Sequence, residues 1–185
     1  ELPATTHLSI VDAEGNALSL TSSIEAAFGS RIMVHGFLLN NQLTDFSFRP
    51  EEGGKPVANR VEAGKRPLSS MAPTVIYDQA GRLAGVLGSP GGSRIINYVA
   101  KTVLALLAWN LTPGEAVALP HFGSRNGPTE LERGTEAERL RPALEKLGHA
   151  VTIHDMTSGL SLIVWRGGEW VGAADPRREG SARGE

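Results

Sequence analysis

Ala4-Thr5-Thr6-His7 is the stretch around which this sequence is organised, because an alternating pattern follows it directly. Apolar and more polar residues alternate over 7–11 and again over 17–21. Such alternation is typical of half-buried strands, and the Gly15-Asn16 pair between the two segments is typical of a turn. The sequence therefore predicts a β-hairpin that presents Thr5 at the start of a central strand. The apolar positions are Leu8, Ile10, Leu18 and Leu20.

Three further stretches follow Thr5 along the chain: Leu39-Asn40-Asn41-Gln42, Arg66-Pro67-Leu68-Ser69-Ser70-Met71 and Gly88-Ser89-Pro90-Gly91-Gly92-Ser93. Each is unremarkable by itself. In this order the four pieces resemble the small (beta) subunit of the gamma-glutamyltransferase (gamma-glutamyltranspeptidase) family, and the resemblance runs from Thr5 to about Arg177. That family belongs to the N-terminal nucleophile (Ntn) hydrolases. It is made as a precursor that cuts itself in front of a Thr.

The resemblance implies that Thr5 is the nucleophile. A Thr hydroxyl needs a base at neutral pH, and the α-amine of an N-terminal Thr supplies one because its pKa is about 8. Residues Glu1 to Ala4 precede Thr5, so the amine becomes free only when the Ala4–Thr5 bond is cut. Without the other stretches, Thr5 would be read simply as the opening residue of a strand. His7 is expected to pack or to point away from the face of Thr5.

Residues that match the family's donor site follow the hairpin. The resemblance implies that Ser23 hydrogen-bonds the nucleophile, and that Gln42 and Asp45 hold the α-ammonium of the substrate. A carboxylate suits an ammonium through a charge-assisted hydrogen bond. Glu25 stands where the family commonly has Asn, at a position linked to the same α-amino group. The alternative for Glu25 and Asp45 is that they are ordinary loop carboxylates.

Two more pairs complete the implied site. The family uses a Ser pair, here Ser69 and Ser70, for the α-carboxylate of the substrate, together with an Arg from the large subunit. The backbone of Gly91 and Gly92 would form the oxyanion hole. Glycines turn tightly and expose N–H groups, and a helix predicted from about residue 93 to 109 adds positive potential. The same geometry suits a phosphate, but the stretch lacks the spacing of a P-loop.

Composition excludes several classes of function. The chain has 185 residues, 41% of them hydrophobic and 21% charged, which suits one folded domain. A net charge of -2 gives no indication of a nucleic-acid or anionic-membrane partner, and zero Cys excludes disulfides and thiolate metal sites. The three histidines His121, His149 and His154 have no metal-ligand spacing, and no metal or cofactor is expected.

The domain organisation follows from these matches. Residues 1–4 are expected to be a residual precursor segment, 5–177 the catalytic small subunit and 178–185 a loose tail. Residues 49–65 are rich in Pro, Gly and charge and are expected to form an exposed loop, shorter than in lidded relatives and without an aromatic residue. Phe37-Leu38-Leu39 is expected to be a buried strand. A kink or late helix start is expected at Pro142.

We therefore predict an α+β fold, the small-subunit half of an Ntn-hydrolase αββα sandwich with antiparallel sheets flanked by helices. The implied activity is cleavage of gamma-glutamyl amides such as glutathione, with an acyl-enzyme on Thr5, and the implied partner is the large (alpha) subunit from the same precursor. Two alternatives stay open: a glutaryl or cephalosporin-type acylase, and an uncleaved, non-catalytic scaffold. The compartment is open as well. It is periplasmic or secreted if an upstream half carries a signal peptide, and cytoplasmic otherwise.

Overall fold

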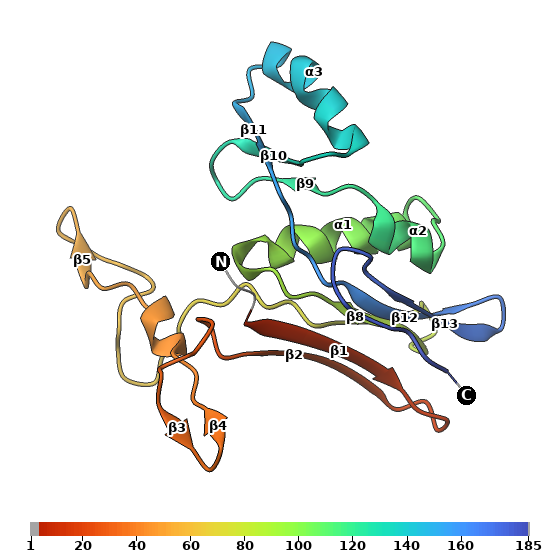
Figure 1. Ribbon diagram of the computed structural model, residues 1–185, viewed down its shortest axis with the longest axis horizontal. Helices are drawn as coiled ribbons and strands as arrows, with labels where there is room; N and C mark the ends of the chain where they lie inside the picture. The colour runs from red at the N-terminus through yellow and green to blue at the C-terminus, as the bar shows by residue number, and fades with distance from the viewer. Residues whose placement is uncertain (1–3, 185) are drawn as a thin grey trace.

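A four-stranded antiparallel sheet forms the middle layer of the protein in the computed structural model, which describes residues 4–184 (Figure 1). The strand order is β13-β12-β8-β7. Their bounds are β7 Thr74–Tyr77, β8 Leu83–Gly88, β12 Ser161–Arg166 and β13 Glu169–Ala174. Strand β8 is apolar on both faces and its last residues are fully buried, which is typical of a strand covered on both sides.

Helices cover one face of this sheet. A short 3₁₀ turn η2 (Gly92–Arg94) leads into α1 (Ile95–Leu107), and α2 (Pro113–Ala118) follows. Thr112 caps α2: its hydroxyl accepts from the Glu115 N–H, and the Glu115 carboxylate accepts from the Thr112 N–H at 2.8 Å. The core lies between these helices and the sheet and includes Leu87, Ile95, Tyr98, Leu106, Val117, Leu160 and Leu162. In the described part of the chain no helix is long and apolar enough to cross a membrane.

The hairpin of β1 (Thr5–Val11) and β2 (Ala17–Ser23) covers the other face of the sheet, as Figure 1 shows in dark red. Its inward side chains are polar. Ser9 donates to the Ser161 carbonyl at 3.1 Å, and Ser19 donates to the Leu87 carbonyl at 2.9 Å. The two β-layers are therefore joined by hydrogen bonds as well as by packing.

The apolar face of the hairpin points outward. Leu8, Ile10, Leu18 and Leu20 are 43–47% exposed. The hairpin itself and its turn agree with the sequence prediction. The predicted half-buried alternation is confirmed, but the apolar positions are the exposed ones, because the polar positions face the sheet. The three layers present are β, β and α, and an uncovered apolar face stands where a fourth layer would pack.

Residues 24–73 form an extended arm beside these layers, drawn in orange to yellow in Figure 1. It contains only short elements: β3 Met33–Val34, β4 Phe37–Leu38, η1 Gln42–Asp45, β5 Glu51–Glu52 and β6 Lys55–Pro56. Phe37 is 59% exposed, so the prediction of a buried strand there is wrong. The strand is a two-residue hairpin partner with too few neighbours to cover it.

The remaining elements form a smaller unit above α1 and α2. They are β9 Phe122–Gly123, β10 Thr129–Glu132, η3 Glu136–Leu140, α3 Arg141–Lys146 and β11 Val151–His154. Pro142 lies in the first turn of α3, which confirms the late helix start. Strands β10 and β11 pair in parallel, a departure from the antiparallel pattern predicted. The helical crossover between them makes this parallel pairing possible.

Candidate active site

Thr5 and Ser23 meet at the open end of the hairpin. The register of β1 and β2 pairs these two residues, and their hydroxyl oxygens lie 2.9 Å apart. The Glu25 N–H donates to the Ser23 hydroxyl at 2.9 Å, so that Ser23 is held in place from the chain that leaves β2. At this distance one hydroxyl donates a hydrogen bond to the other. The Thr5 hydroxyl therefore has a hydrogen-bond partner that fixes the position of its oxygen.

The peptide bond in front of Thr5 is part of the same ladder. The Ala4 carbonyl accepts from the Ile24 N–H at 3.3 Å and from the Ser23 hydroxyl at 3.4 Å. Both donors point at the oxygen that would become negatively charged if this bond were attacked. These two hydrogen bonds therefore polarise the carbonyl group of the Ala4–Thr5 peptide bond.

His7 lies on the same face as Thr5, because the two residues are two positions apart along a strand. Its ring packs against Gly88, where an added Cβ would come within 2.2 Å of the ring. Ring nitrogens contact the hydroxyls of Thr21 at 2.8 Å and Ser9 at 3.2 Å. Burial lowers the pKa of His7 to about 4. His7 therefore packs, as expected, but does not point away from the face of Thr5.

The glycine-rich loop connects β8 to α1. Gly91 has φ 141° and Gly92 has φ 58°, values that L side chains rarely adopt. The Tyr98 ring lies 2.5 Å from where a Cβ on Gly91 would sit, so a larger residue has no room there. Ser89 is buried and accepts from the Gly159 N–H at 3.1 Å. This loop is therefore fixed from both sides and ends at the N-terminus of η2 and α1.

The predicted ammonium-binding residues lie on one connected stretch of the arm. Gln42 begins η1 and Asp45 ends it. The Asn41 N–H donates to the Ile24 carbonyl at 3.3 Å, and the Asn41 side chain accepts from the Ala26 N–H at 3.0 Å. These bonds tie the start of η1 to the residues on either side of Glu25, whose own φ is 70°. The Gln42 amide oxygen is buried and has no hydrogen-bond donor among the described residues.

The serine pair lies further along the arm. Ser69 is exposed and accepts from the Met71 N–H at 3.2 Å, as in a serine turn, and Ser70 is partly buried. Asn59 links this stretch to η1, because it accepts from the Leu68 N–H at 3.0 Å and donates to the Asp45 carbonyl at 2.7 Å. Sequence reasoning gave Asn59 no role. The only hint in the sequence is that Asn59 is a polar residue inside a Pro- and Gly-rich loop.

A cleft of about 250 Å³ opens beside Thr5. Thr5, Pro90, Gly159 and Asp175 are among its lining residues, and the segment 178–181 forms another part of its wall. Arg178 is anchored there because its Nε donates to the Thr157 carbonyl at 2.9 Å. Of the predicted site residues only Thr5 lines this cleft. The others, Ser23, Glu25, Gln42, Asp45, Ser69, Ser70, Gly91 and Gly92, lie outside its lining.

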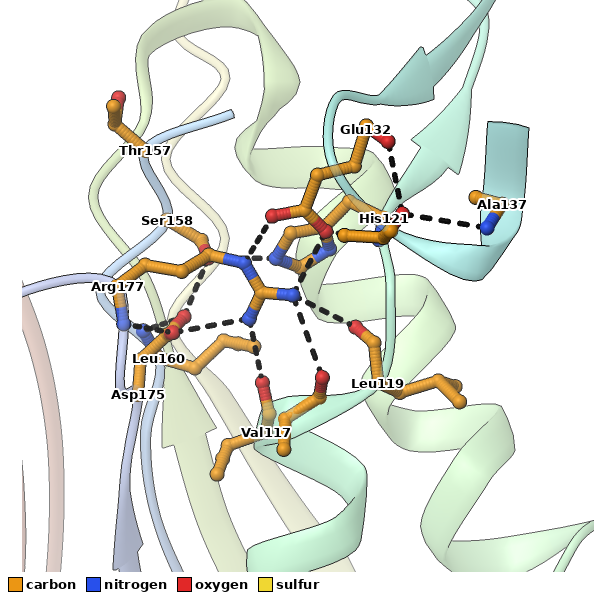
Figure 2. A network of polar contacts seen from close by, with 12 residues as sticks. Val117, Leu119, His121, Glu132, Ala137, Thr157, Ser158, Leu160, Asp175 and Arg177 are labelled. Atoms are coloured by element: carbon orange, nitrogen blue, oxygen red, sulfur yellow. Dashed lines mark hydrogen bonds and ion pairs between the residues drawn. The ribbon is translucent and has the colours of Figure 1, made fainter. Parts of the chain in front are cut away.

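A buried polar network meets the cleft at Asp175, which belongs to both (Figure 2). The Arg177 guanidinium donates to Glu132 at 2.8 Å and to Asp175 at 3.1 Å, and it also donates to the carbonyls of Val117 and Leu119. The Ser158 hydroxyl donates to Asp175. Asp175 therefore joins the end of β13 to α2 and β10 through one cation. The family resemblance runs to about Arg177, but nothing in the sequence indicated the partners of Arg177 or Asp175.

Two further titratable groups border this network. His121 is 1% exposed and contacts Ser158 at 2.6 Å, and burial lowers its pKa to about 2. Lys101 is 4% exposed and donates to the Leu119 carbonyl at 2.6 Å. Burial, together with the nearby Arg177 cation, lowers the pKa of Lys101 to about 7. The charge of this interior is thus sensitive to pH near neutrality.

A second ionic group connects Arg94, just after the glycine loop, to Glu130 on β10. Burial alone would raise the pKa of Glu130, but hydrogen bonds from Arg94 and Arg125 outweigh it and lower the pKa to about 2. The distances to Glu130 are 2.7 Å from Arg94 and 2.5 Å from Arg125, which also donates to Ser93 at 2.8 Å. Within residues 4–184, His, Asp and Glu side chains form no group of three that could hold a metal ion.

Known proteins resemble this chain over nearly its whole length. The glutathione hydrolase proenzyme of Escherichia coli (strain K12) is 41% identical over 185 residues, which cover 94% of this chain and 31% of that protein. A mutant gamma-glutamyltranspeptidase of Helicobacter pylori superposes with a TM-score of 0.82 and 35% identity, covering 94% of this chain and 100% of the solved chain. This confirms the predicted Ntn-hydrolase fold.

The fold is shared more widely. A cephalosporin acylase from Bacillus halodurans superposes with a TM-score of 0.82 at 22% identity, covering 97% of this chain and 34% of that one, a likeness that concerns the fold alone. The chain spans about a third of the length of the curated relatives it matches. The sequence model of the gamma-glutamyltranspeptidase family matches residues 1–185. The chain belongs to the gamma-glutamyltranspeptidase family.

Proposed function

We propose that this chain carries the catalytic machinery of an enzyme that cleaves gamma-glutamyl amides such as glutathione. The observation that carries the proposal is the Thr5–Ser23 hydroxyl pair, 2.9 Å apart beside a cleft and at the start of a strand. Thr5 Oγ1 attacks the γ-carbonyl carbon, and the leaving amine departs as the acyl-enzyme ester forms. Water or an acceptor amine then releases the γ-glutamyl group.

The base for this reaction is the α-amine of Thr5, freed by cleavage of the Ala4–Thr5 bond in a precursor. It takes the hydroxyl proton as the C–O bond forms and returns it to the leaving amine. The N–H groups of Gly91 and Gly92 take the developing oxyanion. Removal of one such donor typically costs about 10²–10³ in kcat. Their positive φ values and the ring of Tyr98 hold that loop in one shape.

The substrate's α-amino acid group binds on the arm. Gln42 and Asp45 bind the ammonium, and Ser69 and Ser70 bind the carboxylate. Glu25 is close to Ser23, whose hydroxyl accepts from the Glu25 N–H. The Gln42 amide oxygen lacks a donor among the described residues, and an ammonium would supply one. An Arg from the partner subunit completes the carboxylate site.

The partner is the large subunit from the same precursor, and it covers the outer face of the β1–β2 hairpin. That face presents four aliphatic side chains that are each more than two-fifths exposed. The relatives are about three times as long as this chain, so the missing length is ample to supply a covering layer. Burial of an aliphatic side chain stabilises by about 1.5–3 kcal/mol. We also propose that the catalytic small subunit comprises residues 5–177, preceded by a precursor segment at 1–4 and followed by a tail at 178–185.

Thr5→Ala in the full precursor tests the proposal. We expect no cut at Ala4–Thr5 and no release of aniline from a γ-glutamyl anilide, because both steps use the Thr5 hydroxyl. Thr6→Ala is the matched control, since the neighbouring Thr6 is exposed on the opposite face of β1. Intact mass reports the cut. A Thr5→Ala precursor that still processes at this bond, or a wild-type protein that stays uncut and inactive as a scaffold would, overturns the proposal.

A second candidate is a related acylase acting on glutaryl or cephalosporin-type side chains. Glu25 leaves room for it, because this residue departs from the family's usual Asn at the position linked to the α-amino group. Asp45 argues against it, because a glutaryl group has no ammonium for this carboxylate to bind. A panel of γ-glutamyl and glutaryl anilides on the two-subunit protein separates the two. A higher kcat/KM on the glutaryl compound selects the acylase.

A further inference from the structure

Asn59 joins two stretches of the arm that are far apart in sequence. Its side-chain amide donates to the Asp45 carbonyl at 2.7 Å, and its side-chain oxygen accepts from the Leu68 N–H at 3.0 Å. Asp45 is the last residue of η1, and Leu68 is followed directly by Ser69. One side chain therefore uses its donor and its acceptor on two different backbones.

The backbone of Asn59 is itself held in place. Its carbonyl accepts from the Ser47 N–H at 2.9 Å, and Ser47 forms a parallel bridge with Arg60. Lys65 donates to the Ala58 carbonyl at 3.2 Å, which closes the loop on the far side. The bridging amide is thus attached to a fixed point and does not hang from a free loop.

We propose that Asn59 is a positioning residue that sets the spacing between the ammonium-binding and carboxylate-binding halves of the donor site. This inference rests on the proposed function. The two charged groups of a γ-glutamyl substrate sit on one carbon atom, so their binding partners must keep one separation. Asp45 belongs to the first half and Ser69 with Ser70 to the second. The Asn59 amide is the direct link that the structure places between them.

The chemistry requires an amide of this length. Asp has the same size but no N–H to donate to Asp45, and Ala can make neither bond. In either variant each half of the site keeps its own residues. What is lost is their fixed separation, and a substrate that uses both halves at once suffers most. A substrate that uses one half alone is nearly indifferent.

Steady-state kinetics on the full two-subunit protein test this with three anilides. The γ-glutamyl anilide has both charged groups, the glutaryl anilide has only the carboxylate, and the 4-aminobutanoyl anilide has only the ammonium. For Asn59→Ala we expect KM for the γ-glutamyl compound to rise about tenfold, the effect of one or two lost hydrogen bonds, with kcat changed less than about twofold. KM for the two half-substrates changes less than about twofold.

Asn59→Asp and Glu62→Gln complete the experiment. Asn59→Asp keeps the volume and the acceptor and should behave like Asn59→Ala, and it decides the matter if the Ala variant fails to process. Glu62→Gln is the matched control: it removes the exposed ion pairs to Arg60 at 2.6 Å and Lys65 at 2.9 Å in the same loop, and should leave KM unchanged.

The outcomes separate the two proposals. If the wild type cleaves the γ-glutamyl anilide but Asn59→Ala loses equally on all three compounds, or loses kcat alone, the positioning role is overturned and the proposed function stands. If Glu62→Gln reproduces the effect, general loop stability explains it and the role is again overturned. A wild type inactive on the γ-glutamyl anilide overturns the proposed function itself.

Discussion

The Thr5–Ser23 contact depends on strand register at the scale of single residues. Antiparallel pairing sets Thr5 opposite Ser23, and a shift by one residue would turn Ser23 to the other face. The inward polar row then fixes that register against the sheet, since Ser9 and Ser19 each donate to a carbonyl of β12 or β8. The partner of Thr5 is thus selected by hydrogen bonds that lie further along the two strands.

We expect Asp45 to bind the α-ammonium of the substrate. Asp45→Asn keeps the shape of the side chain and removes its charge. We expect kcat/KM on a γ-glutamyl anilide to fall by the factor that corresponds to a loss of about 1.5–3 kcal/mol in binding free energy. The loss should appear mainly in KM, and a glutaryl anilide should be almost unaffected. Steady-state kinetics on both compounds give the comparison. Equal losses would mean that Asp45 only supports η1.

Lys101 should destabilise the fold near neutral pH. Burial lowers the pKa of Lys101 from its ordinary 10.5 to about 7, so between these values the unfolded chain holds a proton that the folded chain has released. Stability from this group therefore rises as the pH rises from 7 toward 10.5. The charges around it are Arg177, Asp175 and Glu132.

Lys101→Met checks this sign. Arg177 still donates to the Leu119 carbonyl at 3.2 Å, so that oxygen keeps a partner. We expect the variant to be more stable than the wild type at pH 7 by roughly 1–3 kcal/mol, with the difference shrinking by about pH 9.5. Urea unfolding at the two pH values measures it. A difference that widens with pH would contradict the assignment.

The loop of residues 49–65 matters at the scale of elements. It forms the small β5–β6 hairpin and the turn that carries Asn59, and it contains no Phe, Tyr or Trp. A lid with an aromatic residue would shield an acyl group on Thr5 from water. This loop offers hydrogen bonds that position the arm but no apolar cover.

We therefore expect hydrolysis to exceed transfer. With a γ-glutamyl anilide and excess glycylglycine at mildly alkaline pH, most of the acyl group should appear as free glutamate, because water reaches the ester readily. Product partition by chromatography gives the ratio. If most of the acyl group ends on the dipeptide, cover from elsewhere in the protein replaces the lid.

The uncovered hairpin face matters at the scale of the whole molecule. This chain supplies a β, β and α layer, and the inter-sheet contacts are largely polar, whereas the outer face of β1 and β2 is aliphatic. The arm also exposes large side chains, such as Phe28, Phe48 and Leu43 at 65–87%. Exposed apolar area of this extent indicates an interface.

Leu20→Asp tests this interface. Leu20 pairs across the hairpin with Leu8 on the outer face, and a carboxylate buried there would be strongly unfavourable. We expect a large drop in soluble, processed two-subunit protein on size exclusion. Leu147→Asp is the control, because Leu147 is 77% exposed at the end of α3. Equal yields for the two variants would exclude the hairpin face as the interface.

The sequence by itself determined the local elements and the family. Period-two alternation located β1 and β2, and the glycine loop before α1 was recognised from its residues. These features depend on backbone propensities and on the spacing of apolar residues, both of which are set by residues close together in the sequence. The same alternation, however, does not say which side of a hairpin faces its own chain.

Only the tertiary structure decided which distant groups meet. The polar face of the hairpin turned inward because the sheet offers carbonyls to Ser9 and Ser19. The bridge from Asn59 to Asp45 and Leu68, and the cation of Arg177 between Glu132 and Asp175, join residues from separate elements. Such contacts depend on how the elements pack. No local pattern encodes them, because a hydrogen bond across a fold needs two backbones brought together by everything that lies between.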